Sequence, residues 1–208
     1  MSPLQAARCA KRYNYYTNPL SVIAQVTFMN IIEELVKKHH GKYSQDPKKA
    51  SNLTSGRFTF QPQQGILTID GTKVSININA VGGAAETAEP YRIVLHLEKN
   101  YESSLEIFPK TSLRRILDFF ISKSKPTNSE IANKQFSFNG NNQLIRKLGT
   151  DNAFCTKLQH EKVFILISRK QPKHIVLTPA HGIDDIEHLE KLLSILKMIE
   201  GKIKSKNT

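Results

Sequence analysis

The chain has 208 residues, of which 39% are hydrophobic, so it is long and apolar enough to fold as one domain or as two small ones. This composition excludes a collagen-like or a wholly disordered chain. Lys and Arg number 30 against 18 Asp and Glu, which gives a formal net charge of +12. Such a charge bears on the choice of partners, since a cationic protein attracts anions, and not on the fold.

Cysteine usage and hydropathy together predict a cytoplasmic protein. Cys9 and Cys155 are too few for a disulfide framework and lack the spacing of zinc ligands, so both are expected to be reduced thiols. Residues 1–11 contain no apolar run of signal-peptide length. The most apolar stretch, residues 20–36, includes Glu33 and Glu34, and a membrane-spanning helix would bury both carboxylates.

The first predicted element is a long helix. It begins at Asn18-Pro19, where Asn can cap the free amides and Pro suits the first helical position, and it runs to about His40. Gly41 is expected to end it in a left-handed conformation. Apolar side chains in residues 20–36 cover more than one face of this helix. The helix therefore needs several partners, and we expect a partner protein or a second copy of the chain to dock there.

An antiparallel sheet is predicted next. The polar residues 42–55 indicate a mobile connection, and Asp70-Gly71 is a strong two-residue hairpin turn. Val74, Ile76 and Ile78 alternate with polar residues, as in a strand with one face in water. The predicted strands cover residues 57–61, 65–69, 73–79, 91–98 and 104–108.

The second half of the chain predicts a mixture of helices and strands. Ser112 is expected to cap a helix that ends at Ile121, and the polar segment 123–133 has the composition of a linker. The remaining predicted elements are strands at 135–138, 162–168 and 174–178, and helices at 143–148, 152–159 and 185–203.

These elements predict an α+β fold, in which a mainly antiparallel sheet packs against N-terminal, middle and C-terminal helices. We expect a smaller α/β subdomain to follow the linker. The predicted organisation is a basic and aromatic segment at 1–18, a helix-sheet-helix domain at 19–122, a linker at 123–133 and a subdomain at 134–208.

Two short stretches suggest a family. Leu105 to Pro109 follows the pattern L-x-I-x-P, and Phe136-Ser137-Phe138 precedes a short helix. With the helix that ends in Gly and the Gly-bounded hairpin, this order resembles a group of uncharacterised bacterial domains of unknown function over residues 35–178. The chain departs from that group at residues 132–135, which contain no acid. The resemblance implies no catalytic residues.

Histidines give the candidate catalytic and metal-binding residues. His181, Asp184 and His188 could approach one metal ion, but Asp184 and Glu187 also form a capping-box pattern, and we favour capping. His96 is a candidate general base with no nucleophile near it in sequence. No metal, cofactor or catalytic residue is therefore predicted.

The two ends of the chain are candidate polyanion-binding segments, because cations neutralise phosphates and aromatic rings stack on bases. Lysines that only keep the protein soluble are the alternative explanation of the charge. The candidate residues are Arg8, Lys11, Arg12, Tyr13, Tyr15 and Tyr16 near the N-terminus and Lys202, Lys204 and Lys206 near the C-terminus.

Three functional hypotheses remain open at this point. The first is a non-enzymatic binding or scaffold domain, favoured because no convergent catalytic set is found. The second is binding of nucleic acid or an anionic surface through the basic ends. The third is an enzyme whose site gathers distant residues such as His96 and His181.

Overall fold

The computed structural model describes residues 30–47, 49–53, 56–78, 91–110, 135–180, 182–183 and 185–205. Every element below belongs to the unit Ile31–Thr208. In chain order these are α2 (Ile31–Lys38), β1 (Lys42–Gln45), β2 (Lys49–Leu53), β3 (Gly56–Phe60), β4 (Gln63–Ile69), β5 (Thr72–Ile78), β6 (Tyr91–His96), β7 (Leu105–Pro109), β8 (Phe136–Gly140), α5 (Asn142–Gly149), α6 (Asn152–Leu158), β9 (Val163–Ile167), β10 (His174–Pro179) and α7 (Ile186–Lys204).

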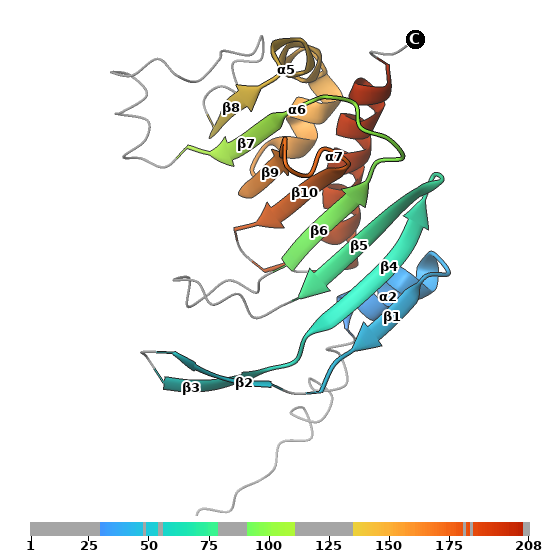
Figure 1. The fold of residues 1–208 in the computed structure, drawn as a ribbon, viewed down its shortest axis with the longest axis vertical. Helices are drawn as coiled ribbons and strands as arrows, with labels where there is room; N and C mark the ends of the chain where they lie inside the picture. The colour runs from blue at the N-terminus through green and yellow to red at the C-terminus, as the bar shows by residue number, and fades with distance from the viewer. Residues whose placement is uncertain are drawn as a thin grey trace, which may run out of the picture. The chain divides into compact units, whose positions relative to one another are not determined.

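Eight strands form one sheet in the order β1-β4-β5-β6-β10-β9-β7-β8 (Figure 1). Every neighbouring pair in it is antiparallel, which confirms the predicted α+β fold with a mainly antiparallel sheet. β2 and β3 pair in a separate two-stranded sheet. β6 pairs with β10 and β7 pairs with β8, so strands from both sides of residues 123–133 build the large sheet. That predicted linker and the predicted helix at 112–121 lie outside the described residues.

The described helices pack on one face of the sheet. α7 contacts β10 and also α2, α5 and α6, so the four helices form one layer (Figure 1). In β10, Ile175 and Leu177 are fully buried on this side, whereas Val176 and Thr178 on the other side are only partly buried. We call the side opposite α7 the helix-free face, because no helix of the described segments packs on it.

A glycine allows α2 to approach the sheet closely. A Cβ atom on Gly65 of β4 would lie 2.6 Å from Cγ2 of Ile32 and 2.8 Å from Cγ2 of Val36. Ile32, Leu35 and Val36 are therefore core residues that contact the sheet at β4 and β1. These three residues of the apolar stretch 20–36 are therefore buried in the core of the domain. Residues 20–29 lie outside the described part of the chain.

The turns show one prediction confirmed and one wrong. Asp70 and Gly71 adopt φ angles of 45° and 75° between β4 and β5, as the predicted hairpin turn requires. At the end of α2, His40 and not Gly41 takes the left-handed conformation, with φ 51°. Glycine is needed at position 41 for another reason: the backbone passes so close to β4 that an added Cβ atom would lie 2.4 Å from the carbonyl oxygen of Ile66.

The prediction that residues 42–55 form a connection without regular structure was wrong. Residues 42–45 form β1, which pairs with β4 at one edge of the sheet, and residues 49–53 form β2. β1 has the polar sequence KYSQ, so its propensity for a strand is low. Backbone hydrogen bonding to β4 supplies the order that the sequence pattern does not indicate.

Candidate functional site

Strand register places one residue from every strand in a row across the helix-free face. Directly paired residues of antiparallel strands lie on the same side of a sheet. From one edge to the other, the row contains Lys42, Ile66, Ser75, Val94, Val176, Leu166, Glu106 and Asn139. The row is apolar in its middle and polar or charged at both ends.

β9 carries large apolar side chains on both of its faces. Val163, Ile165 and Ile167 point to the helix layer and are each 1% exposed. Phe164 and Leu166 point to the helix-free face and are 48% and 40% exposed. A strand with one face in water normally places polar residues at such positions. The sequence VFILI of β9 therefore places large apolar side chains at positions where polar residues are usual.

The apolar surface extends from β9 to both neighbouring strands. Val176 of β10 lies directly opposite Leu166, and Thr178 lies opposite Phe164. Ile107 of β7 pairs with Ile165, so Phe108 follows next to Phe164 on the helix-free face. We call Phe108, Phe164, Leu166 and Val176 the sheet patch.

Exposed cations lie on the helix-free face in strands β6, β5 and β1, which are two, three and five strands away from β9. Lys42 of β1, Lys73 of β5 and Arg92 of β6 are exposed on the helix-free face. None of the three forms an ion pair with another described residue. Among the described strand positions of this face, Glu106 of β7 is the acidic residue. The surface therefore combines an apolar centre with an excess of positive charge.

Two histidines and a serine lie on the same face. Oγ of Ser75 and Nε2 of His96 share a hydrogen bond of 2.7 Å, and the ring of His174 meets that of His96 edge-on at 4.9 Å between centroids. Partial burial, followed by the effects of His174 and Lys73, lowers the pKa of His96 below its ordinary value of 6.5. His96 is therefore favoured in its neutral form at neutral pH.

A serine hydroxyl beside a neutral histidine is the start of a nucleophile–base pair. Two further parts that acyl transfer needs are not assembled by the described residues. Ser75 pairs with Ile66 on one side and Val94 on the other, so its backbone lies inside the ladder and offers no oxyanion hole. No carboxylate of the described residues hydrogen-bonds to His96 to orient its ring. Within the described part of the chain, the pair joins β5 to β6 and neither of these supporting groups accompanies it.

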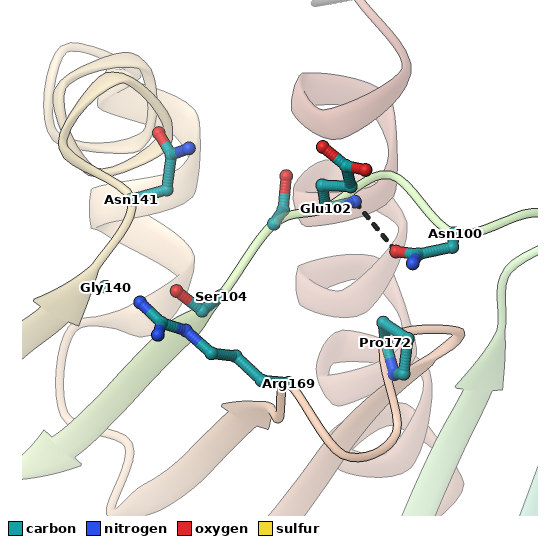
Figure 2. A pocket seen from close by; sticks show the side chains of 8 residues that line it. Asn100, Glu102, Ser104, Gly140, Asn141, Arg169 and Pro172 are labelled. Carbon is teal, nitrogen blue, oxygen red and sulfur yellow. Dashed lines mark hydrogen bonds between the residues drawn. The ribbon is translucent and has the colours of Figure 1, made fainter.

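A cavity of about 600 Å³ lies at the ends of β7 and β8 (Figure 2). Its lining is polar and consists of Asn100, Glu102, Ser103, Ser104, Gly140, Asn141, Arg169 and Pro172. Figure 2 shows the Arg169 side chain extending toward Ser104, whereas the carboxylate of Glu102 points away from the guanidinium.

Several polar groups of this cavity already form hydrogen bonds within a turn or at a helix end. Oδ1 of Asn100 accepts a hydrogen bond of 2.8 Å from the backbone of Glu102, and Oδ1 of Asn141 caps α5. Gly140 has φ 120°, and a Cβ atom added at this position would lie 2.2 Å from the carbonyl oxygen of Ser104. The cavity is thus a junction of turns, and its side chains do not converge on one point.

The predicted polyanion-binding residues are only partly described. Residues 8–16 and Lys206 lie outside the described part of the chain. Nζ of Lys202 lies 2.7 Å from Asp151, and Nζ of Lys204 lies 2.8 Å from Glu200. The hydrogen bond to Glu200 raises the pKa of Lys204. Both lysines are therefore engaged with acids of the same domain, and binding of a polyanion at the two ends stays a prediction.

The N-terminus of α7 is capped, but through Asp185 and the backbone of His188 and not by the predicted capping box of Asp184 and Glu187. Asp185 caps this helix by accepting a hydrogen bond of 2.7 Å from the backbone N–H of His188. The ring of His188 lies 3.1 Å from the carboxylate of Glu161. His181 and Asp184 are not among the described residues. Within the described ranges, no three His, Cys, Asp or Glu side chains form a group that could hold a metal ion.

The sequence predicted β9, but the exposed apolar side chains of this strand were not expected. Five consecutive apolar residues in VFILI leave no polar position for the side of the strand that faces water. That run was available from the sequence alone. The contact between Ser75 and His96 was not, because it depends on the register of β5 with β6.

Comparisons with known proteins add no functional information. No protein-family model, no curated protein and no solved structure matches the chain. The resemblance to uncharacterised bacterial domains therefore stays a prediction. Across the described helices, none combines the length and the apolar character that crossing a membrane requires.

Proposed function

We propose that the protein is a non-enzymatic binding domain and that it docks its partner on the helix-free face of the sheet. The observation that carries this proposal is the exposure of Phe164 and Leu166, 48% and 40%, in the interior of an eight-stranded sheet. β9 lies two strands from the nearest edge, so these side chains are not there to protect an edge. Covering an apolar surface of this kind with a partner removes it from water and favours association.

This docking surface differs from the one expected from the sequence at residues 20–36. Residues 20–29 of that stretch lie outside the described part of the chain, so docking through them stays a prediction. Ile32, Leu35 and Val36 are buried against β1 and β4 within the domain itself. An enzymatic role has less support, because the Ser75–His96 pair lacks an oxyanion hole and an orienting acid among the described residues.

A cytoplasmic location belongs to the same proposal. The thiol of Cys155 is free and buried, and its Sγ atom lies 3.7 Å from the carbonyl oxygen of Leu148. A domain that uses its cysteine as a small core residue suits a reducing compartment.

Site-specific photo-cross-linking in cells tests the docking face. A photoreactive amino acid is placed at Phe164 in one variant and at Glu187, an exposed position in the first turn of α7, in a control variant. The proposal expects adducts from position 164 that disappear when Leu166→Asn is added, and none from position 187. Equal adducts from both positions, or none from position 164, would contradict it.

A further inference from the structure

We infer that the partner of the helix-free face is single-stranded nucleic acid, whose bases stack on the phenylalanines of the sheet patch while its phosphates meet the cations of β1, β5 and β6. This inference rests on the proposed function, since it names the ligand of the same face. It does not use the basic ends of the chain.

The aromatic rings supply the first argument. Phe164 is 48% exposed, and Phe108 lies beside it on β7. Every base has an apolar face, so an exposed ring on a sheet that helices support from behind is a suitable stacking platform. In a duplex, neighbouring base pairs already cover these faces. Stacking on Phe164 is therefore open to a single strand and closed to a double helix.

The position of the cations supplies the second argument. Arg92 of β6 pairs with Asn77 of β5. On its other side β6 pairs with β10, and because Ile93 lies opposite Leu177, Arg92 lies beside Thr178. Thr178 in turn pairs with Phe164. Arg92 is thus two strands from the aromatic ring, or about 10 Å at the usual strand spacing. A strand of nucleic acid that crosses the sheet can place a base on Phe164 and a phosphate near Arg92.

Charge favours nucleic acid over a protein partner. The described strand positions of this face hold the cations Lys42, Lys73 and Arg92 and one acid, Glu106, and the whole chain carries +12. Burying these three cations, which form no ion pair with a described residue, against an uncharged protein surface would cost desolvation without compensation. Phosphates compensate the same cations and release their own counterions on binding.

Amide side chains complete the surface. Nε2 of Gln64 donates a hydrogen bond of 2.8 Å to Oδ1 of Asn77 between β4 and β5, and Asn139 lies at the opposite end of the central row. Such groups can hydrogen-bond to base edges of an unpaired strand. The arrangement offers groups for stacking, for phosphate neutralisation and for polar contacts on one face of the sheet.

Fluorescence anisotropy with labelled oligothymidine and oligouridine of about 12 nucleotides, a length within the range of single-strand binding sites, tests the inference. Phe164→Leu keeps an apolar side chain and removes the aromatic face, whereas Phe164→Trp keeps the aromatic face. The inference expects Phe164→Leu to weaken binding about 5- to 100-fold, the loss of one stacked base, and Phe164→Trp to retain it. Because position 164 is half exposed, both variants should keep the wild-type circular dichroism.

A second pair of variants tests the phosphate contact. Arg92→Gln should weaken binding and lower the slope of log K against log salt by about one. Lys170→Gln, an exposed cation in the turn between β9 and β10, should leave that slope unchanged. Binding of both oligonucleotides that is insensitive to Phe164→Leu and Arg92→Gln would overturn the inference, as would equal affinity for a duplex of the same length.

The outcomes separate this inference from the proposed function. Failure of both oligonucleotides to bind at low salt, together with specific protein adducts from position 164, would overturn the inference and leave the docking face intact. No oligonucleotide binding and no adducts from position 164 would overturn both.

Discussion

The hydroxyl of Thr72 in β5 donates a hydrogen bond of 2.7 Å to the carboxylate of Glu200 in α7. Glu200 is only 2% exposed, and Nζ atoms of Lys197 and Lys204 lie 2.6 and 2.8 Å from its oxygens. A buried carboxylate is stable only when donors satisfy it. This group of four side chains therefore fastens the last helix to the sheet, on the side opposite the proposed binding face.

Replacing Thr72 tests this connection. Thr72→Val keeps the shape of the side chain and leaves the buried carboxylate with one donor fewer, so we expect the free energy of unfolding to fall by about 1–3 kcal/mol. Urea denaturation measures the change. Thr68→Val on the exposed side of β4 is the matched control and should change the value by less than about 0.5 kcal/mol. Equal losses in the two variants would contradict the connection.

The same carboxylate predicts a dependence of stability on pH. Burial by itself raises the pKa of Glu200, but hydrogen bonds from Lys197, Lys204 and Thr72 outweigh it and hold the pKa below its ordinary value of 4.5. The unfolded chain therefore takes up the proton more readily than the folded one. The stabilisation is present above the ordinary pKa and is lost as the pH falls through the folded-state pKa.

Stability measured against pH in the wild type and in Glu200→Gln detects this loss. At neutral pH the wild type should be the more stable of the two. We expect the difference to shrink steadily on acidification below about pH 4.5. A difference that is independent of pH would show that ionisation of Glu200 does not contribute.

His96 predicts a second pH dependence in a higher window. Burial, His174 and Lys73 lower its pKa in the folded state below 6.5, so the unfolded chain binds this proton first. The contribution of neutral His96 to the free energy of unfolding should therefore be fully present above about pH 6.5. It should decrease as the pH falls from there toward the folded-state pKa. His96→Gln should remove this component. An NMR titration in which the ring of His96 protonates at or above its ordinary pKa would refute the prediction.

Two glycines give opposite predictions for the same substitution. Gly65→Ala would place a Cβ atom against Ile32 and Val36, so we expect a loss of about 1–3 kcal/mol in the free energy of unfolding. Gly201 lies in the exposed part of α7, with no atom within 4 Å of an added Cβ. Gly201→Ala should stabilise the protein by about 0.5–1 kcal/mol because Ala is the better helix former. Thermal unfolding of the two variants should shift in opposite directions, and a Gly65→Ala variant as stable as the wild type would contradict the described packing of α2 on β4.

Local chemistry explains which parts of the fold were predictable. Asp70-Gly71 specifies its turn through backbone conformation, and the apolar period of residues 186–204 specifies α7, so both were found from the sequence. β1 was missed because its four residues are polar and gain order from pairing with β4. Gly41 was assigned the wrong role because its close approach to Ile66 depends on tertiary structure.

The candidate site was less accessible to sequence reasoning than the fold. A strand of five apolar residues has no alternation, so its pattern does not say which side chains face the helices and which face outward. Only the register with β10 and β7 places Phe164 and Leu166 on the helix-free face. The shared face of Arg92 and Phe164 also follows only from the register of β6 with β10 and of β10 with β9.

The central claim is that Phe164 and Leu166 serve binding and not folding. To test this, the photoreactive amino acid is placed at Val176, which lies directly opposite Leu166. The free energy of unfolding and the yield of adducts are then measured with and without the double substitution Phe164→Thr and Leu166→Thr. We expect the two threonines to change the free energy of unfolding by less than about 1 kcal/mol and to abolish the adducts. Adducts of undiminished yield, or a loss of stability as large as that of the buried substitution Ile165→Thr, would contradict it.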